Sequence, residues 1–213
     1  MSELVPAKTG RAARTREALI RAGRELFAER PVDAVAIDDI VQAADVAKGS
    51  FYNHFLDRDA LVRAVVGEIR EGIEAKIGAV NAGVDDPARR VARAVCVYQR
   101  YALDEPLRAR VLVRVHSGFA SLSSPLNQGG IDDITVGLAN GRFSIATVEA
   151  GLLFVMGAAA TAMARTSSDP SPPLAISLAQ QICALILRGL GVPSAEAEAI
   201  SAQAADEIVR GGD

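Results

Sequence analysis

The sequence is poor in the residues that carry most metal and redox chemistry. Its 213 residues include no tryptophan, two cysteines and two histidines, and aromatic side chains make up 4% of the chain. Cys96 and Cys183 stand far apart, without a CxxC motif or the Cys/His spacing of a zinc site. They fit buried thiols in a reducing compartment better than a disulfide framework. The sequence therefore predicts neither a metal site nor a cofactor.

The groups needed for catalysis are also scarce. Cys96 and His116 could in principle form a thiolate pair. No third orienting group, oxyanion motif or phosphate-binding glycine loop accompanies them in the sequence. A protein without a catalytic site is expected.

Long hydrophobic runs are missing as well. The longest apolar run, Ala150–Ala164, is shorter than the roughly 20 residues that span a bilayer as a helix. The N-terminal segment lacks the apolar core of a signal peptide. The sequence predicts a cytoplasmic protein without a membrane partner.

What remains is ordinary globular composition, with 50% hydrophobic and 23% charged residues. Plentiful glycine and alanine with few aromatic side chains favour closely packed helices over a β-sandwich. The expected fold is all-α in two domains. The first, residues 1–60, is a small three-helix unit with a basic N-terminal arm, and the second, residues 61–213, is a larger helical domain.

The net charge of −3 is distributed unevenly. Residues 1–30 carry seven Lys and Arg against four Glu, whereas the chain from residue 64 onward carries more acidic than basic residues. The excess of basic residues near the N-terminus suggests an anionic partner, although an Arg-rich solvated helix face would show the same pattern. Residues 1–13 are expected to form a mobile arm, with a helix beginning near Thr15 and ending before Pro31.

The stretch 35–61 predicts two short helices around a tight turn. Apolar residues recur at i, i+3, i+4 and i+7 from Ile37, and helices this short must pack on their neighbours. Asp45 occupies the turn position that often holds glycine, and Asp tolerates positive φ better than most residues. The predicted shared core comprises Leu26, Phe27, Ile40, Val41, Val46, Phe51, Phe55 and Leu61.

The second of these helices, expected over Lys48–Phe55, combines inward phenylalanines with polar outward positions. Lys48 at its start suits a phosphate, and Gly49 would let a duplex approach the backbone. Ser50 and Asn53, three residues apart, could reach base edges in a major groove. Tyr52 and His54 could contact phosphates on either side, and Arg58 adds a charge. A merely polar surface helix is the alternative, and the combination favours DNA binding.

This segment resembles the N-terminal DNA-binding domain of the tetracycline-repressor (TetR) family of bacterial transcription regulators. The resemblance implies DNA contacts through Lys48, Gly49, Ser50, Tyr52, Asn53, His54 and Arg58. It departs at Ala36, Asp45 and Ala47, where a capping Thr, a turn Gly and a Ser are usual. The matching residues are Arg16, Leu19, Ala22, Leu26, Phe27, Ile37, Asp38, Asp39, Ile40, Ala44, Val46, Lys48, Gly49, Phe51, Tyr52, His54, Phe55, Ala60 and Leu61.

The rest of the chain predicts a series of helices that end in two strongly apolar ones, Ser144–Arg165 and Pro173–Gly189. These form either a buried hairpin of the monomer or a pair that meets its twin across a two-fold axis. The second interpretation is preferred. It predicts a dimer interface of Leu152, Val155, Ala159, Leu178, Ile182, Leu185 and Ile186.

The resemblance implies a small-molecule effector site among these helices. Its candidates are polar or aromatic residues within apolar helices, although each fits core packing better than ligand contact. They are Cys96, Tyr98, Tyr101, His116, Phe119, Phe154 and Met156.

The resulting hypothesis is a homodimeric, ligand-responsive repressor of a pseudo-palindromic double-stranded DNA operator. The alternative is a helical dimer that binds proteins or small molecules without specific DNA binding. A basic helix-turn-helix segment favours the first, and the departures at Ala36 and Asp45 are the best support for the second.

Overall fold

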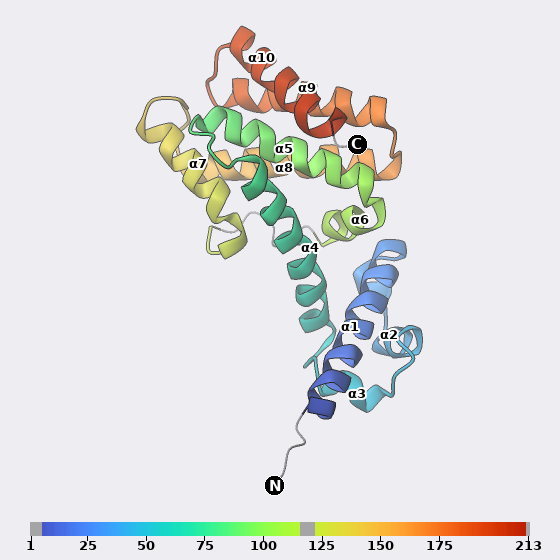
Figure 1. Cartoon of the computed structure of the whole chain (residues 1–213). Helices are drawn as coiled ribbons and strands as arrows, with labels where there is room; N and C mark the ends of the chain where they lie inside the picture. The colour runs from blue at the N-terminus through green and yellow to red at the C-terminus, as the bar shows by residue number, and fades with distance from the viewer. Residues whose placement is uncertain (1–5, 116–121, 212–213) are drawn as a thin grey trace. The chain divides into compact units, whose positions relative to one another are not determined.

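The computed structural model describes residues 6–115 and 122–211, and every regular element in those ranges is helical (Figure 1). The all-α prediction is therefore confirmed. The chain divides into two compact units, Met1–Ile69 and Arg70–Asp213, and the boundary falls inside helix α4.

The N-terminal unit contains three helices packed around a small apolar core, followed by the first part of a fourth. Phe27, Ile40, Phe51 and Leu61 are fully buried, as predicted, whereas Leu26 and Val46 are half-buried. The elements are α1 (Pro6–Glu29), the 3₁₀ turn η1 (Val32–Ala34), α2 (Ile37–Ala43), α3 (Lys48–Tyr52) and the start of α4 (Arg58–Val80).

Helix α1 begins at Pro6, so it takes in much of the segment that was expected to be a mobile arm over residues 1–13. Arg14 Nε donates to the Gly10 carbonyl at 3.1 Å, and the Thr15 hydroxyl donates to the Arg11 carbonyl at 3.0 Å. The prediction was wrong because it followed the apolar periodicity, which marks only the packed part of a helix. Residues 10–14 are exposed, and α1 continues through them toward its N-terminus.

The C-terminal unit packs its longest helices side by side. In Figure 1, α9 and α10 lie over α5 and α8, and α6 and α7 flank them at opposite ends. Its elements are the end of α4, α5 (Pro87–Asp104), α6 (Pro106–Arg114), the 3₁₀ turn η3 (Pro125–Asn127), α7 (Gln128–Ala139), α8 (Val148–Ser168), α9 (Pro172–Gly189), α10 (Ser194–Ala205) and the π-helical turn η4 (Asp206–Arg210).

Caps fix where these helices begin. The Asp86 side chain accepts a hydrogen bond from Ala88 N at 3.0 Å and Pro87 occupies the first helical position, so α5 starts there. The Thr147 hydroxyl accepts from Ala150 N at 3.1 Å, which starts α8 at Val148 instead of the expected Ser144.

The two cysteines lie in the core of this unit. Cys96 on α5 and Cys183 on α9 are both buried and free, with their Sγ atoms 3.8 Å apart. The hydrogen bond to Cys96 and burial raise the pKa of the Cys183 thiol. The prediction of buried thiols is confirmed, and such thiols are poor nucleophiles because the reactive thiolate is disfavoured.

Arg142, in the connection between α7 and α8, ties three parts of the unit together. Its guanidinium donates to both oxygens of Asp86 at 2.9 and 3.0 Å, and to both oxygens of Glu196 on α10 at 3.0 and 2.7 Å. These charge-assisted pairs lower the pKa of Glu196. Through Arg142, these ion pairs connect the start of α5 to the start of α10, which helps to hold the two helices together.

Among the described residues, one helix, α8, is long and apolar enough to cross a membrane by length and composition alone. A core helix of a helical bundle has the same composition. Helix α8 contacts α5, α6, α7 and α9, which accounts for the apolar character of its inner face.

Candidate functional site

The surface of the N-terminal unit that was predicted to bind DNA is built on the buried side chain of Phe51. Its ring is fully buried and lies 5.7 Å from the ring of Phe55 and 5.4 Å, edge to face, from the ring of Tyr52. With Phe51 held inside, Tyr52 points outward and is 53% exposed. The same segment therefore packs Phe51 into the core and exposes Tyr52 on its outer face.

The other predicted contact residues lie along this outward face. Lys48, Gly49 and Asn53 are exposed, and Ser50 and His54 are half-buried. Helix α3 ends at Tyr52, so Asn53 is its C-terminal cap and His54 follows in the turn. Asn53 keeps helical dihedrals (φ −73°, ψ −17°), which extends the path of α3 by one residue. The helix is thus shorter than the expected Lys48–Phe55.

Gly49 is not required by the fold itself. A Cβ at this position would meet no other protein atom within 4 Å. Glycine in an exposed helix costs stability relative to alanine, by about 1 kcal/mol. Close approach of another molecule to the backbone would explain why this position has no side chain.

Two basic residues of the set are engaged by neighbouring carboxylates. Lys48 Nζ lies 2.7 Å from Asp38 Oδ1, and this exposed hydrogen bond raises the pKa of Lys48. Arg58 is less available, because Nη1 donates to the Asp33 carbonyl and Nη2 to the Asp33 carboxylate, both at 3.2 Å. A polyanion would have to compete with Asp38 for Lys48 and with Asp33 for Arg58.

The turn between α2 and α3 has the conformation expected from its sequence. Asp45 has φ of +52°, and it is the one non-glycine residue with positive φ among those described. Val46 N donates to the Val41 carbonyl at 3.0 Å, which closes the turn. Ala36 offers no side-chain acceptor to the start of α2, but its own N–H donates to Asp39 Oδ2 at 3.1 Å. Of the two hydrogen bonds that make a capping box, the one from the Ala36 N–H to the Asp39 side chain is therefore present.

Replacing Asp45 with glycine should stabilise the N-terminal unit by about 0.5–1 kcal/mol, because glycine adopts positive φ without a Cβ clash. Hydrogen exchange of amides in residues 19–65 would measure the change. Asp45→Asn is the matched control and should be close to neutral, since Asn tolerates this region about as well as Asp. Faster exchange in Asp45→Gly would contradict the strain assigned to this turn.

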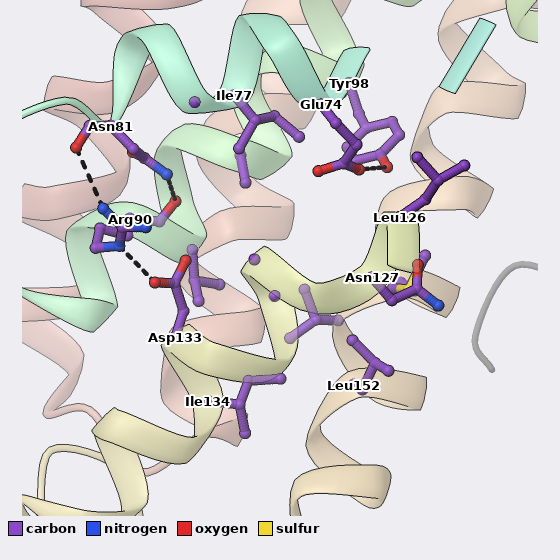
Figure 2. Close-up of a pocket in the computed structure, with 17 residues that line it drawn as sticks. Glu74, Ile77, Asn81, Arg90, Tyr98, Leu126, Asn127, Asp133, Ile134 and Leu152 are labelled. Carbon is purple, nitrogen blue, oxygen red and sulfur yellow. Dashed lines mark hydrogen bonds and ion pairs between the residues drawn. The ribbon is translucent and has the colours of Figure 1, made fainter. Parts of the chain in front are cut away.

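The C-terminal unit contains a cavity of about 170 Å³, lined by residues of α4, α5, η3, α7 and α8 and of the turn after α4 (Figure 2). Its walls are largely apolar. Lining residues are Glu74, Ile77, Gly78, Asn81, Arg90, Val91, Ala94, Tyr98, Leu126, Asn127, Gly129, Gly130, Asp133, Ile134, Leu152, Val155 and Met156. A smaller apolar pocket of about 40 Å³ shares Ala94, Tyr98, Val155 and Met156 with it.

Polar groups in this cavity form two clusters. At one, the Tyr98 hydroxyl donates to Glu74 Oε1 at 3.2 Å, and Arg70 lies 3.7 Å from the same oxygen. At the other, the guanidinium of Arg90 binds Asp133 and the Asn81 carbonyl. Burial raises the pKa of Glu74 and Asp133, despite their arginine partners. Burial and the Glu74 carboxylate raise the pKa of Tyr98, so its hydroxyl remains a donor.

The predicted effector residues are only partly in this cavity. Tyr98 and Met156 line it, whereas three others correct the prediction. Cys96 is buried in the core beside Cys183, Tyr101 is buried with Lys76 Nζ 5.4 Å from its ring centroid, and Phe154 is 44% exposed. His116 and Phe119 lie outside the described residues.

Sequence reasoning missed most of the polar lining residues. Glu74 and Asn81 lie two turns apart with Ile77 between them, and this spacing places all three on one face. Charged residues on an otherwise apolar helix face were the available signal. The missed residues with polar side chains are Glu74, Asn81, Arg90, Asn127 and Asp133.

The predicted dimer interface also needs correction. Leu152, Ala159 and Ile186 are buried inside the protomer, and Val155 lines the cavity. These four side chains face inward because α5, α7 and α9 cover that side of α8, and α8 and α5 cover α9. The outward apolar side chains are exposed Leu153, Phe154 and Leu185, with half-buried Leu178 and Ile182.

Comparison with known proteins identifies the relatives of both units. Residues 19–65 match the family described as bacterial regulatory proteins, tetR family, and residues 86–203 match the tetracyclin repressor-like C-terminal domain. The repressor DhaR of Mycobacterium sp. (strain GP1) is 39% identical over 78 residues, 36% of this chain and 39% of DhaR. The repressor BepR of Brucella suis biovar 1 (strain 1330) is 36% identical over 59 residues, 28% of each chain. The chain therefore spans well under half the length of these curated relatives.

Solved structures match over most of the chain. The structure of RolR in complex with resorcinol has a TM-score of 0.62 at 28% identity, with 92% of this chain and 96% of that chain covered. A gamma-butyrolactone receptor superposes with a TM-score of 0.62 at 18% identity, with 92% of this chain and 99% of that chain covered, which supports the fold alone.

Proposed function

Because this chain belongs to the TetR family of bacterial regulatory proteins, we propose that it is a homodimeric repressor that leaves its DNA operator when a small molecule binds. The observation that carries the DNA-binding part is the pairing of buried Phe51 with the exposed polar face of α3. The curated relatives DhaR and BepR are named as helix-turn-helix repressors. A helical dimer without DNA binding is less favoured for the same reasons.

On DNA, α3 would enter the major groove. Lys48, Tyr52 and His54 would contact phosphates, while Ser50 and Asn53 would reach base edges. Gly49 would allow the backbone to approach the duplex. In a dimer, two such helices would occupy successive major grooves about one DNA turn apart, which predicts a pseudo-palindromic operator.

The dimer would form through the outward faces of α8 and α9. Leu153, Phe154 and Leu185 are large apolar side chains about half exposed in the protomer, and Leu178 and Ile182 extend the patch. Exposed apolar patches of this kind mark association surfaces. Because the operator DNA lies in the cytoplasm, the protein would act there.

The cavity gives the switch a physical basis. Glu74, Ile77 and Gly78 lie on the same helix, α4, that begins at Arg58 in the N-terminal unit. A ligand in the cavity would bias the position of α4 and, through it, the separation of the two α3 helices. It can do so only by binding one arrangement more tightly than the other.

Binding of the full-length protein to labelled DNA from upstream of its own gene tests this function. We expect a specific complex whose affinity falls steeply with salt, because each phosphate contact contributes about −0.9 to the slope of log K against log salt. Competition with unrelated DNA of equal length is the control. A flat salt dependence, or equal affinity for both DNAs, would refute operator binding.

A further inference from the structure

The chemistry of the cavity walls restricts what its ligand can be. Six of its lining side chains are polar or charged. Five of them form the two clusters seen in Figure 2, with Ile77 between the clusters, and Asn127 lies apart from both. The inference below rests on the proposed function in one respect, that this cavity is where the effector binds.

The first restriction is charge. Each carboxylate in the walls has an arginine partner, Arg70 for Glu74 and Arg90 for Asp133. Arg70 also donates to the Leu126 carbonyl at 3.0 Å and to Asn127 Oδ1 at 2.5 Å, and Arg90 donates to the Asn81 and Val84 carbonyls. The charges balance, so an anion would gain no net attraction. It would also have to displace a wall carboxylate from its arginine.

The second restriction comes from the acceptors in the walls. Asn81 is 2% exposed, and its Nδ2 donates to the Arg90 carbonyl at 3.2 Å. Its Oδ1 is buried and has no hydrogen-bond partner among the residues that the structure describes. A ligand in the cavity does not reach this buried oxygen. Glu74, whose side chain is 27% exposed, is the accessible acceptor.

Glu74 lines the cavity from α4. It accepts from the Tyr98 hydroxyl through Oε1 and forms an ion pair with Arg70 at 3.7 Å, but burial still raises its pKa, so these partners do not fully compensate for lost hydration. A carboxylate can accept up to about four hydrogen bonds. A ligand donor beside Glu74 would supply a further one.

The third restriction is size. The cavity measures about 170 Å³, and an apolar protein cavity of about 150 Å³ accepts benzene. Apolar side chains, among them Ile77, Ile134 and Leu152, line the cavity beside the polar clusters. The walls therefore suit a single ring.

We propose that the effector is a neutral compound with one aromatic ring and a hydrogen-bond donor that Glu74 accepts. The wall carboxylates exclude carboxylated rings, and donor-free rings leave the acceptor capacity of Glu74 unused. The site thus discriminates by the presence of a donor and by charge, with ring shape common to all three classes.

Three single-ring probes separate these classes in calorimetric titrations of the full-length protein: resorcinol, toluene and benzoate. Resorcinol supplies two O–H donors, toluene none, and benzoate a negative charge. We expect resorcinol to bind at least tenfold more tightly than either of the others. Equal affinities for resorcinol and toluene, or tighter binding of benzoate, would overturn the proposal.

Glu74→Gln tests the role of the carboxylate with little change of volume. A glutamine can still accept from Tyr98, so folding should be kept, and thermal unfolding verifies this. Resorcinol affinity should fall about tenfold because a charge-assisted hydrogen bond becomes a neutral one. Benzoate affinity should rise, because a like charge is removed and Arg70 loses its anionic partner. If Glu74 had only a structural role, Glu74→Gln would not weaken resorcinol binding while it strengthens benzoate binding.

Glu71→Gln is the matched control, since Glu71 is exposed on the same helix and does not line the cavity. It should leave both affinities unchanged. If Glu74→Gln changes neither affinity, or lowers both equally, the assignment of Glu74 fails. Operator binding by the wild-type protein is measured separately, so a protein that binds its operator but not resorcinol would refute this inference and leave the proposed function standing.

Discussion

Phe51→Ala should abolish operator binding by unfolding the N-terminal unit. Phe51 is fully buried between Phe55 and Tyr52. Truncating a buried phenylalanine costs about 3–5 kcal/mol. A single core below about 70–80 residues rarely supplies more than that amount, so the substitution removes most of the stability of this unit. Hydrogen exchange should show loss of protection in residues 19–65 and retained protection in α5, α8 and α9.

The neighbouring residue provides the matched control for this prediction. Tyr52→Ala removes a ring of similar size that is 53% exposed, so protection of the N-terminal unit should be kept while DNA affinity falls. If Phe51→Ala retains wild-type exchange in residues 19–65, Phe51 is not the anchor of α3. If the larger unit also loses protection, the two units do not unfold separately.

The double substitution Lys48→Ala and Tyr52→Ala should weaken operator binding roughly a hundredfold or more without unfolding the protein. A hydrogen bond to a charged group contributes about 1.5–3 kcal/mol, and two such contacts would be lost. Both side chains are mostly exposed, so the core is unaffected. The slope of log K against log salt should become less steep by about 0.9, because the cationic phosphate contact of Lys48 disappears, whereas the neutral Tyr52 releases no counterion.

Asp38→Asn should have the opposite effect. Asp38 holds Lys48 at 2.7 Å and places a negative charge beside the proposed phosphate contact. Removing that charge frees Lys48 and should raise affinity for any duplex, which electrophoretic mobility shifts at several salt concentrations would measure. Weaker binding by Asp38→Asn would show that the ion pair orients Lys48 for DNA instead of competing with it.

Local patterns predicted the N-terminal unit well. The spacing of Ile37, Ile40 and Val41 marked α2, and the turn residue Asp45 adopts the positive φ that its position required. Such features depend on neighbours within a few positions, which the sequence displays directly. The early start of α1 was missed because residues 10–14 are exposed, so no apolar periodicity marks that part of the helix.

The assignment of side chains in the C-terminal unit was much less predictable. Leu152 and Leu153 are adjacent and chemically identical, yet one lines the cavity and the other is half exposed. Met156 and Tyr98 reach the cavity, whereas Phe154, on the same helix as Met156, lies against Gly189 at the end of α9. Helices that are apolar on every face carry no periodicity to show which side faces the core.

By itself, the sequence determined the helical fold class, the helix-turn-helix with its outward polar face, and the family. Only the tertiary structure decided that α4, α5, α7 and α8 line a cavity, that Glu74 and Asn81 are among its lining residues, and that Leu152, Ala159 and Ile186 belong to the core. The reason is physical: a helix-turn-helix is specified by residues close in the chain, whereas burial, pairing and cavity shape depend on segments that meet only after folding.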